Sequence, residues 1–123
     1  MKKACLAIIL LLLSGCTSAS PSSINASDDL HCAVVLRTLE KDANRLGAPP
    51  DARKGLYVLQ TWYFSKIERE RLVDAQGVVE MMKRDPSKVV TAGKECSNRA
   101  FGDPDFPRWK EIASDDFEQK GMQ

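Results

Sequence analysis

The sequence contains a single histidine, His31, and lacks the short motifs that build catalytic or metal sites. It has no Cys-x-x-Cys pair, no glycine-rich loop for phosphate and no calcium-binding loop. Nucleophilic catalysis needs a serine or cysteine, a base and an orienting acid that converge, and no glycine-flanked serine follows the first 27 residues. These absences argue against an enzyme and predict neither a bound metal nor a cofactor.

The chain also lacks an excess of charge of one sign. It has 18 Lys and Arg residues against 17 Asp and Glu, and no basic stripe with interleaved aromatic residues, which would indicate nucleic-acid binding. Two carboxylate pairs, Glu68 with Glu70 and Asp115 with Asp116, lie in charge-rich stretches that favour solvent exposure over acid-base chemistry. We therefore expect no nucleic-acid partner and a surface position for these carboxylates.

Long apolar runs and strand patterns are missing as well. The longest uninterrupted apolar run, from Ala4 to Leu13, has ten residues, about half of the ~20 that a permanent membrane-spanning helix needs. The β-branched doublets Val78-Val79 and Val89-Val90 each lie within a helical period rather than an alternating one. The sequence therefore predicts an all-α protein without a transmembrane helix.

The N-terminus has the organisation of an export signal. Lys2 and Lys3 precede the apolar run, and a Leu-Ser-Gly-Cys motif follows at positions 13–16. Basic residues keep the extreme N-terminus on the cytoplasmic side, and an apolar core of this length suits a removable signal peptide.

The motif at 13–16 resembles the lipobox of bacterial lipoproteins, and the resemblance covers about an eighth of the chain. It implies a diacylglyceryl group on the Cys16 thiol, cleavage between Gly15 and Cys16, and a fatty acyl chain such as palmitate on the new amino terminus. Several acyl chains on one residue anchor a protein stably, whereas one binds only marginally. Thr17 in place of an aspartate implies the outer membrane, with the domain facing the periplasm. The alternative is an ordinary secretory signal cut near Ala19.

The mature chain divides by composition. Residues 1–15 are the predicted signal peptide, and 16–27 are the lipidated cysteine with a linker in which six of the last eleven residues are Ser or Thr. Such a composition predicts a flexible, disordered segment. Residues 28–113 form the predicted helical domain, and 114–123 a frayed tail.

Helical periodicity and punctuation divide the domain into three to four helices. The first runs from 28 or 29 to 46, with Ser27 as its N-cap and Gly47 as its stop. The second begins near Asp51, and a third spans 86–100 with Pro86 in its first turn. A turn-rich arm at 101–107 follows, after which we expect Trp109 and Ile112 to pack back on the bundle.

The second helix is predicted to kink or break at 69–72. Leu59, Tyr63 and Ile67 share one face, whereas the apolar residues from Leu72 to Met82 lie more than 100° around the helix from that face, at about 100° per residue. One straight helix could not bury both stripes against one neighbour.

The four cysteines sort into three roles. Cys5 leaves with the signal peptide and Cys16 carries the lipid, so Cys32 and Cys96 remain as an exported pair on the apolar faces of their helices. A disulfide between them would close a loop of about 64 residues and stabilise the fold by roughly 4 kcal/mol. The alternatives are two buried free thiols or, less in keeping with the spacing, a redox or metal role.

Two further features concern the surface. We interpret His31 as a partly exposed helix residue, since it points about 100° away from Cys32. In the aromatic cluster of the second helix, Tyr57 and Phe64 are candidates for an exposed contact surface, and core packing is the competing interpretation for them.

The leading functional hypothesis is a membrane-anchored envelope lipoprotein whose domain, without enzymatic activity, binds another envelope protein or serves structurally. One specific version is an immunity or inhibitor protein against an envelope-targeted toxin. The alternative is a helical binding module for a small apolar or lipid ligand. A sizeable apolar cavity beside Trp62 and Met81 or Met82 would favour the ligand-binding hypothesis. A filled core with an exposed patch would favour the hypothesis of a protein partner.

Overall fold

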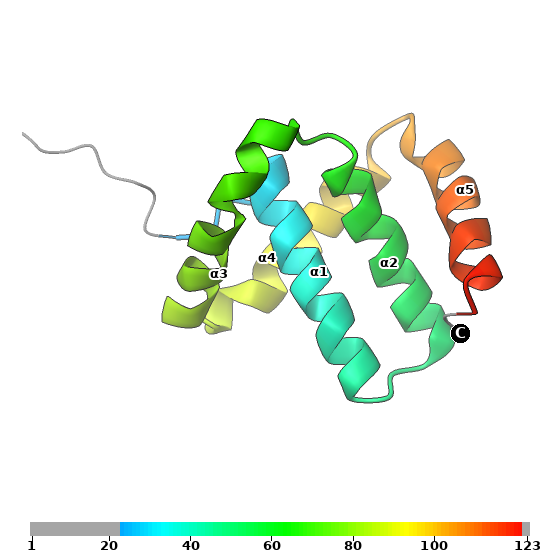
Figure 1. Ribbon diagram of the computed structural model, residues 1–123, viewed down its shortest axis with the longest axis horizontal. Coiled ribbons are helices and arrows are strands. Elements are labelled where there is room, and N and C mark those ends of the chain that lie inside the picture. The colour runs from blue at the N-terminus through cyan, green and yellow to red at the C-terminus, as the bar shows by residue number, and fades with distance from the viewer. Residues whose placement is uncertain (1–22, 122–123) are drawn as a thin grey trace, which may run out of the picture.

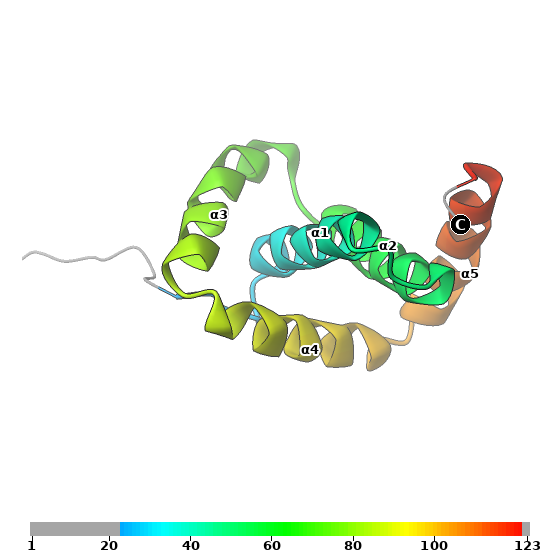
Figure 2. The same ribbon diagram turned by 90° about the horizontal axis from the view of Figure 1, so that it is seen from below.

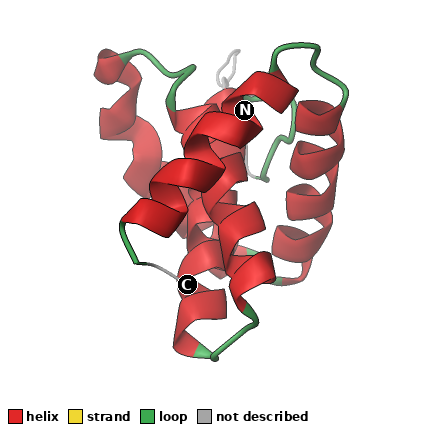
Figure 3. Cartoon of the chain, turned by 90° about the vertical axis from the view of Figure 1, so that its right-hand side faces the viewer, coloured by secondary structure: helices red, strands yellow, loops and turns green. Residues whose placement is uncertain are grey.

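The computed structural model describes residues 23–121, in which every regular element is a helix and no strand occurs (Figure 1, Figure 3). The predicted all-α class and its disulfide are confirmed. The helix count is higher than expected, because the second predicted helix breaks in two and the C-terminal arm forms a helix of its own. The elements are α1 (Asp29–Arg45), α2 (Pro50–Phe64), the 3-10 helix η3 (Arg69–Asp74), α3 (Ala75–Arg84), α4 (Ser87–Phe101) and α5 (Phe106–Gln119).

Helix α1 has well-formed caps at both ends. Asp28, and not Ser27, is the N-cap, since its carboxylate accepts from the Leu30 N–H at 2.8 Å. At the C-terminus Gly47 has φ 72°, and the N–H of Ala48 reaches back to the Ala43 carbonyl at 2.9 Å. This is the Schellman arrangement, in which a left-handed glycine lets the chain satisfy the last carbonyls. The predicted stop at Gly47 is confirmed.

The second helix is interrupted, as predicted, but the interruption begins at residue 65 and not at 69–72. Helix α2 ends at Phe64, and the chain runs through 65–68 into η3 and then α3. Asp51 lies in the first turn of α2, while Pro49 takes the N-cap position that was expected for Asp51. The break leaves α3 free to turn its own apolar face, Val78 and Met82, toward α1.

The helices surround α1 and α2, which form an antiparallel hairpin (Figure 1). Helix α4 crosses this pair on one side, α3 covers α1 at one end of the molecule, and α5 covers α2 at the other (Figure 2). Two buried clusters result. One gathers around Cys32, Tyr63 and Cys96, and the other joins α1 and α3 around Val35 and Val78.

The C-terminal segment is not frayed. Helix α5 runs through Gln119, and its Phe117 side chain is 2% exposed. Trp109 packs back as predicted, with its indole N–H 3.2 Å from the Thr61 hydroxyl, but Ile112 stays 57% exposed. The expected boundary at 114 is therefore wrong, because one buried face of α5 continues past it.

The predicted linker ends earlier than residue 27. Ile24 and Ala26 pack against the two clusters, and the Arg99 guanidinium donates to the Ala26 carbonyl at 3.0 Å. Residues 24–27 are thus a strap on the domain, and we use that name for them. Residues 1–22, which hold the predicted signal peptide and Cys16, lie outside the described part. Among the described helices, none is long and apolar enough to cross a membrane.

Three helical glycines make a matched set. A Cβ added at Gly55 or Gly77 would meet nothing within 4 Å, whereas one at Gly93 would lie 2.6 Å from Leu39 Cδ1. We expect Gly55→Ala and Gly77→Ala each to raise the free energy of unfolding by up to about 1 kcal/mol, through better helix propensity. Gly93→Ala should gain less, because the end of the Leu39 side chain must shift to admit the new methyl group. Denaturant titration measures all three, and an equal gain at Gly93 would contradict this difference, since Leu39 would then move aside at no cost.

Candidate functional site

The disulfide fixes one corner of the domain. Cys32 in α1 and Cys96 in α4 are fully buried and bonded, with Cα atoms 5.6 Å apart and a sequence separation of 64. The predicted pairing is therefore confirmed, and the alternative of two free thiols is excluded. Cys16, the predicted lipidation site, lies outside the described residues.

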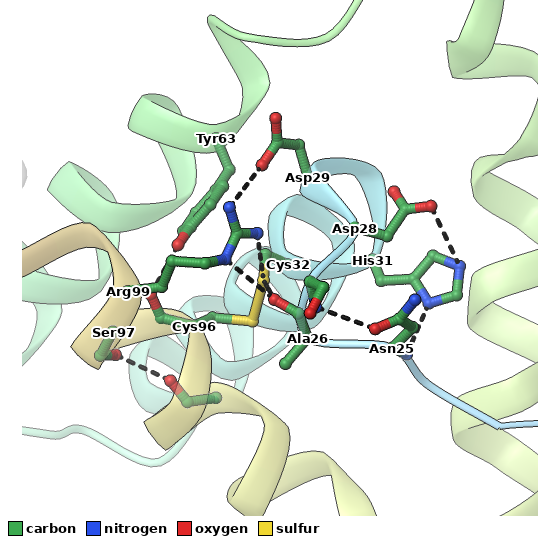
Figure 4. Close-up of a disulfide and its surroundings, with 12 residues drawn as sticks. Asn25, Ala26, Asp28, Asp29, His31, Cys32, Tyr63, Cys96, Ser97 and Arg99 are labelled. Carbon is green, nitrogen blue, oxygen red and sulfur yellow. Dashed lines mark hydrogen bonds and ion pairs between the residues drawn. A yellow bond between two sulfur atoms is a disulfide. The ribbon is translucent and has the colours of Figure 1, made fainter. Parts of the chain in front are cut away.

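Arg99 ties the disulfide corner to the strap (Figure 4). Its guanidinium donates to the Ala26 carbonyl and to the Asp29 carboxylate, both at 3.0 Å, and lies 4.9 Å from the centre of the Tyr63 ring. The Tyr63 hydroxyl in turn donates to the Cys96 carbonyl at 2.6 Å. Burial raises the pKa of this hydroxyl. One side chain thus joins the strap, α1 and α2 around the disulfide.

His31 holds the strap from its other side. Its side chain is buried, with 5% of the residue exposed, so the expectation of a partly exposed histidine is wrong. The Asn25 N–H donates to His31 Nδ1 at 2.8 Å, and His31 Nε2 lies 4.0 Å from the Asp28 carboxylate (Figure 4). Asp28 also pairs with Arg71 of η3 at 3.2 Å. An Nδ1 that accepts a hydrogen bond must be unprotonated, so the strap requires a neutral ring.

The charge on His31 should set a pH dependence. Burial lowers the pKa of His31 from 6.5. The negative charge of Asp28 partly opposes this shift, and the positive charge of Arg71 adds to it. The unfolded chain therefore takes up a proton before the folded one does, and the stability contributed by the neutral ring is present above pH 6.5 and lost as the pH falls. We expect the free energy of unfolding to decrease between roughly pH 7 and 5.

His31→Asn is the matched variant for this measurement, because its side-chain oxygen can still accept the Asn25 N–H and does not titrate. It should lose the slope over that range. The Asp28 carboxylate changes its protonation, and with it the stability of the fold, only at lower pH. Burial raises its pKa, but hydrogen bonds from Arg71 and the Leu30 N–H outweigh this and lower it overall from 3.8. Identical slopes for wild type and variant above pH 5 would rule out His31 as the source.

Tyr57 and Phe64, the predicted contact residues, are half-buried and have different neighbours. The Tyr57 hydroxyl donates to Asp116, and its ring lies 5.5 Å from that of Phe117. Burial, followed by the hydrogen bond to Asp116, raises the pKa of Tyr57. The Arg37 guanidinium lies over the Phe64 ring, 6.0 Å from the centre of that ring. Tyr57 thus seats α5 on α2, and a contact role for either residue stays a prediction.

Trp62 lies in a filled part of the core, and Met82 beside an open groove. The Trp62 ring contacts those of Phe106 at 5.4 Å and Trp109 at 6.1 Å, and the Lys66 ammonium lies 4.2 Å above it. The groove at Met82 measures about 440 Å³ and lies between α1, α3 and α4. Its apolar lining consists of Leu39, Val79, Met82, Pro86, Val89 and Val90.

Sequence reasoning missed a hollow of about 260 Å³ between α2, α5 and the end of α4. We call it the α2–α5 hollow; its lining is Asp51, Lys54, Gly55, Val58, Leu59, Phe101, Phe106, Lys110 and Ser114. Phe101 stands at its rim, 61% exposed, with its ring 5.6 Å from that of Phe106. Gly55, a glycine inside a helix, was the one signal for this hollow in the sequence.

Other chemistry is sparse among residues 23–121. No group of three or more His, Cys, Asp or Glu residues could hold a metal ion there. Glu68 and Glu70 are exposed, as expected. The Asp116 carboxylate accepts the hydrogen bond of the Tyr57 hydroxyl and forms an ion pair with the Lys120 ammonium at 3.1 Å. No family model, no curated protein and no solved structure matches this chain.

Proposed function

We propose that this chain is a non-enzymatic module of the bacterial envelope that binds another protein while lipid on Cys16 tethers it to a membrane, most simply the outer membrane on its periplasmic side. The lipobox-like motif at 13–16 supports the tether. A disulfide-bonded helical domain with the exposed Phe101 beside a hollow supports the binding role.

The exposure of the Phe101 ring is the main observation in support of a binding role. A ring that is 61% exposed beside a hollow, in a chain whose other phenylalanines are half-buried or buried, leaves apolar surface in water. Such exposure costs roughly 25 cal/mol per Å² of apolar area, and aromatic residues are enriched at protein interfaces relative to the rest of the surface. A partner that covers Phe101 would recover this free energy.

The position of the hollow favours a protein partner over the membrane. The strap enters beside α3 at one end of the molecule, and α5 lies at the opposite end (Figure 1). A tether at the strap therefore attaches the domain by the end opposite α5, which leaves the α2–α5 hollow accessible to a partner.

A photo-crosslinking pair tests the binding role in intact cells. Replacing Phe101 by p-benzoylphenylalanine should give one adduct with an envelope protein, identified by mass spectrometry. The same replacement at Val73 of η3, which is 81% exposed, serves as the control. Adducts that are the same at both positions, or absent at 101, would contradict the proposal.

The tether is tested by the intact mass of membrane-extracted protein. We expect a mass that lacks residues 1–15 and carries acyl groups on Cys16, together with loss of two hydrogens for the disulfide. Cys16→Ser should move the protein to the soluble fraction. An unmodified chain that begins near residue 19 or 20 would identify an ordinary secretory signal instead.

The groove at Met82 favours a second candidate, a module for a small apolar ligand. Its volume of about 440 Å³ falls within the usual range of about 300–1,000 Å³ for ligand sites. Against this, the groove is open, whereas such sites enclose most of their ligand. Native mass spectrometry of protein extracted from cells would show a copurified lipid if this candidate were right, and bare protein would count against it.

A further inference from the structure

The α2–α5 hollow has an apolar floor and a charged edge. Val58, Leu59 and Phe106 are buried beneath it, and Phe101 rises at its rim. Its volume of about 260 Å³ lies below the range of about 300–1,000 Å³ typical of sites for whole small molecules. The size therefore suits one large apolar side chain rather than a complete lipid or cofactor.

Gly55 keeps the floor of the hollow open. It lies inside α2, where a glycine costs up to about 1 kcal/mol relative to alanine. No neighbour forces this choice, since a Cβ there would meet nothing within 4 Å. Any larger side chain at position 55 would extend into the hollow, so the glycine gives up helix stability and preserves space for an occupant.

The charges at the edge favour an acidic neighbour for that occupant. The Lys54 ammonium is already paired with Glu118 at 2.9 Å. Asp51 lies in the first turn of α2, where the helix dipole favours a carboxylate. Lys110 is exposed and forms no ion pair among the described residues. A carboxylate on the partner would find Lys110 available.

We propose that the α2–α5 hollow receives one aromatic or branched aliphatic side chain of a partner protein, from a segment that places a carboxylate next to it for Lys110. This inference rests on the proposed function and deepens it by naming the contact. The apolar side chain supplies most of the affinity as an anchor in a pocket, and the carboxylate selects the segment.

Two short peptides probe this contact directly. The first is acetyl-Gly-Ser-Asp-Phe-Ser-Gly-amide, and the second replaces its aspartate by lysine. Each is titrated to millimolar concentration into isotope-labelled protein, because a single side chain in a pocket binds weakly. We expect the first peptide to shift the amide resonances of Gly55, Phe101 and Lys110, and to bind several-fold more tightly than the second. Lys110→Glu should reverse that preference.

Gly55→Leu against Gly77→Leu is the matched control. Both glycines lie in helices with open space where a Cβ would be, but only position 55 lines the hollow. Gly55→Leu should abolish the shifts, and Gly77→Leu should leave them unchanged. An unchanged unfolding midpoint or a higher one confirms that each variant is folded.

Several outcomes would overturn the inference. Equal affinity for the two peptides removes the acidic selection, and shifts that survive Gly55→Leu place the contact elsewhere. Stronger shifts with laurate or with phospholipid vesicles would identify an acyl chain as the occupant. The two proposals fail separately. If crosslinking at Phe101 still gives its adduct in the Gly55→Leu background, the chain binds a protein but not through this hollow, so the inference fails and the proposed function stands. If Phe101 gives no adduct in the wild-type background, the proposed function itself fails.

Discussion

Replacing both Cys32 and Cys96 by alanine is expected to lower the free energy of unfolding by about 4 kcal/mol, and the unfolding midpoint by roughly 15 to 30 °C. The bond closes a loop between residues 64 positions apart, so its loss restores a large conformational entropy to the unfolded chain. Domains of this size have total stabilities of only about 5–15 kcal/mol. Thermal unfolding followed by circular dichroism measures the shift.

Alanine is the appropriate replacement at both positions, because both sites are fully buried and a serine hydroxyl there would add the cost of an unpaired polar group. Unfolding wild type in reductant gives the matching measurement without a change of side chain. The two midpoints should fall together. A double variant as stable as the wild type would show that the bundle holds α1 against α4 without the covalent bond.

Phe117→Ala should lower the free energy of unfolding by about 3–5 kcal/mol, as large aromatic deletions in protein cores do. The ring is buried in α5 and packs against Tyr57, so its loss leaves a cavity between α5 and α2. Denaturant titration followed by tryptophan fluorescence is a direct measurement, because Trp62 and Trp109 lie in the same α2–α5 contact.

Ile112→Ala on the same helix is the matched control. Ile112 is 57% exposed, and truncating a side chain at a surface position changes stability by only a few tenths of a kcal/mol. If Phe117→Ala were as mild as Ile112→Ala, the C-terminal segment would not be docked, and the original expectation of a frayed tail would be restored.

Local sequence signals predicted much of the fold because they reflect local physics. Gly47 as a helix stop follows from the ease with which glycine adopts a positive φ, and this position shows φ 72°. A break, predicted at 69–72 and found from residue 65 onward, followed from two apolar stripes that no straight helix could bury together. Sorting cysteines by compartment gave the pair Cys32 and Cys96.

Helix α5 was missed because its signals conflict. Pro104 and Pro107 suggest a turn, yet Pro107 lies in the first turn of α5, where its missing N–H costs nothing. The buried residues Phe106, Ala113 and Phe117 are spaced by seven and four, and charged residues fill the intervals. The α2–α5 hollow could not be predicted either, because α5, which forms one of its walls, was not among the expected helices.

The strap was missed for a different reason. The hydrogen bonds from Asn25 to His31 and from Arg99 to Ala26 join backbone and side chains across 6 and 73 residues. No periodicity encodes such contacts, and a Ser-rich composition predicts only that the segment is polar. The surroundings of His31 likewise include Asp28 and its partner Arg71, which η3 brings from later in the chain.

The disulfide also decides how this domain would respond to mechanical load. A pull between the tether and a protein held at α5 would first strain the strap and the opening turn of α1, as far as Cys32. From there the tension passes through the sulfur–sulfur bond to Cys96 and leaves the intervening loop, with most of α1 and all of α2 and α3, unstretched. Only α5 and the end of α4 remain in the line of force, so the packing of Phe117 against Tyr57 of α2 sets the tension that the domain withstands.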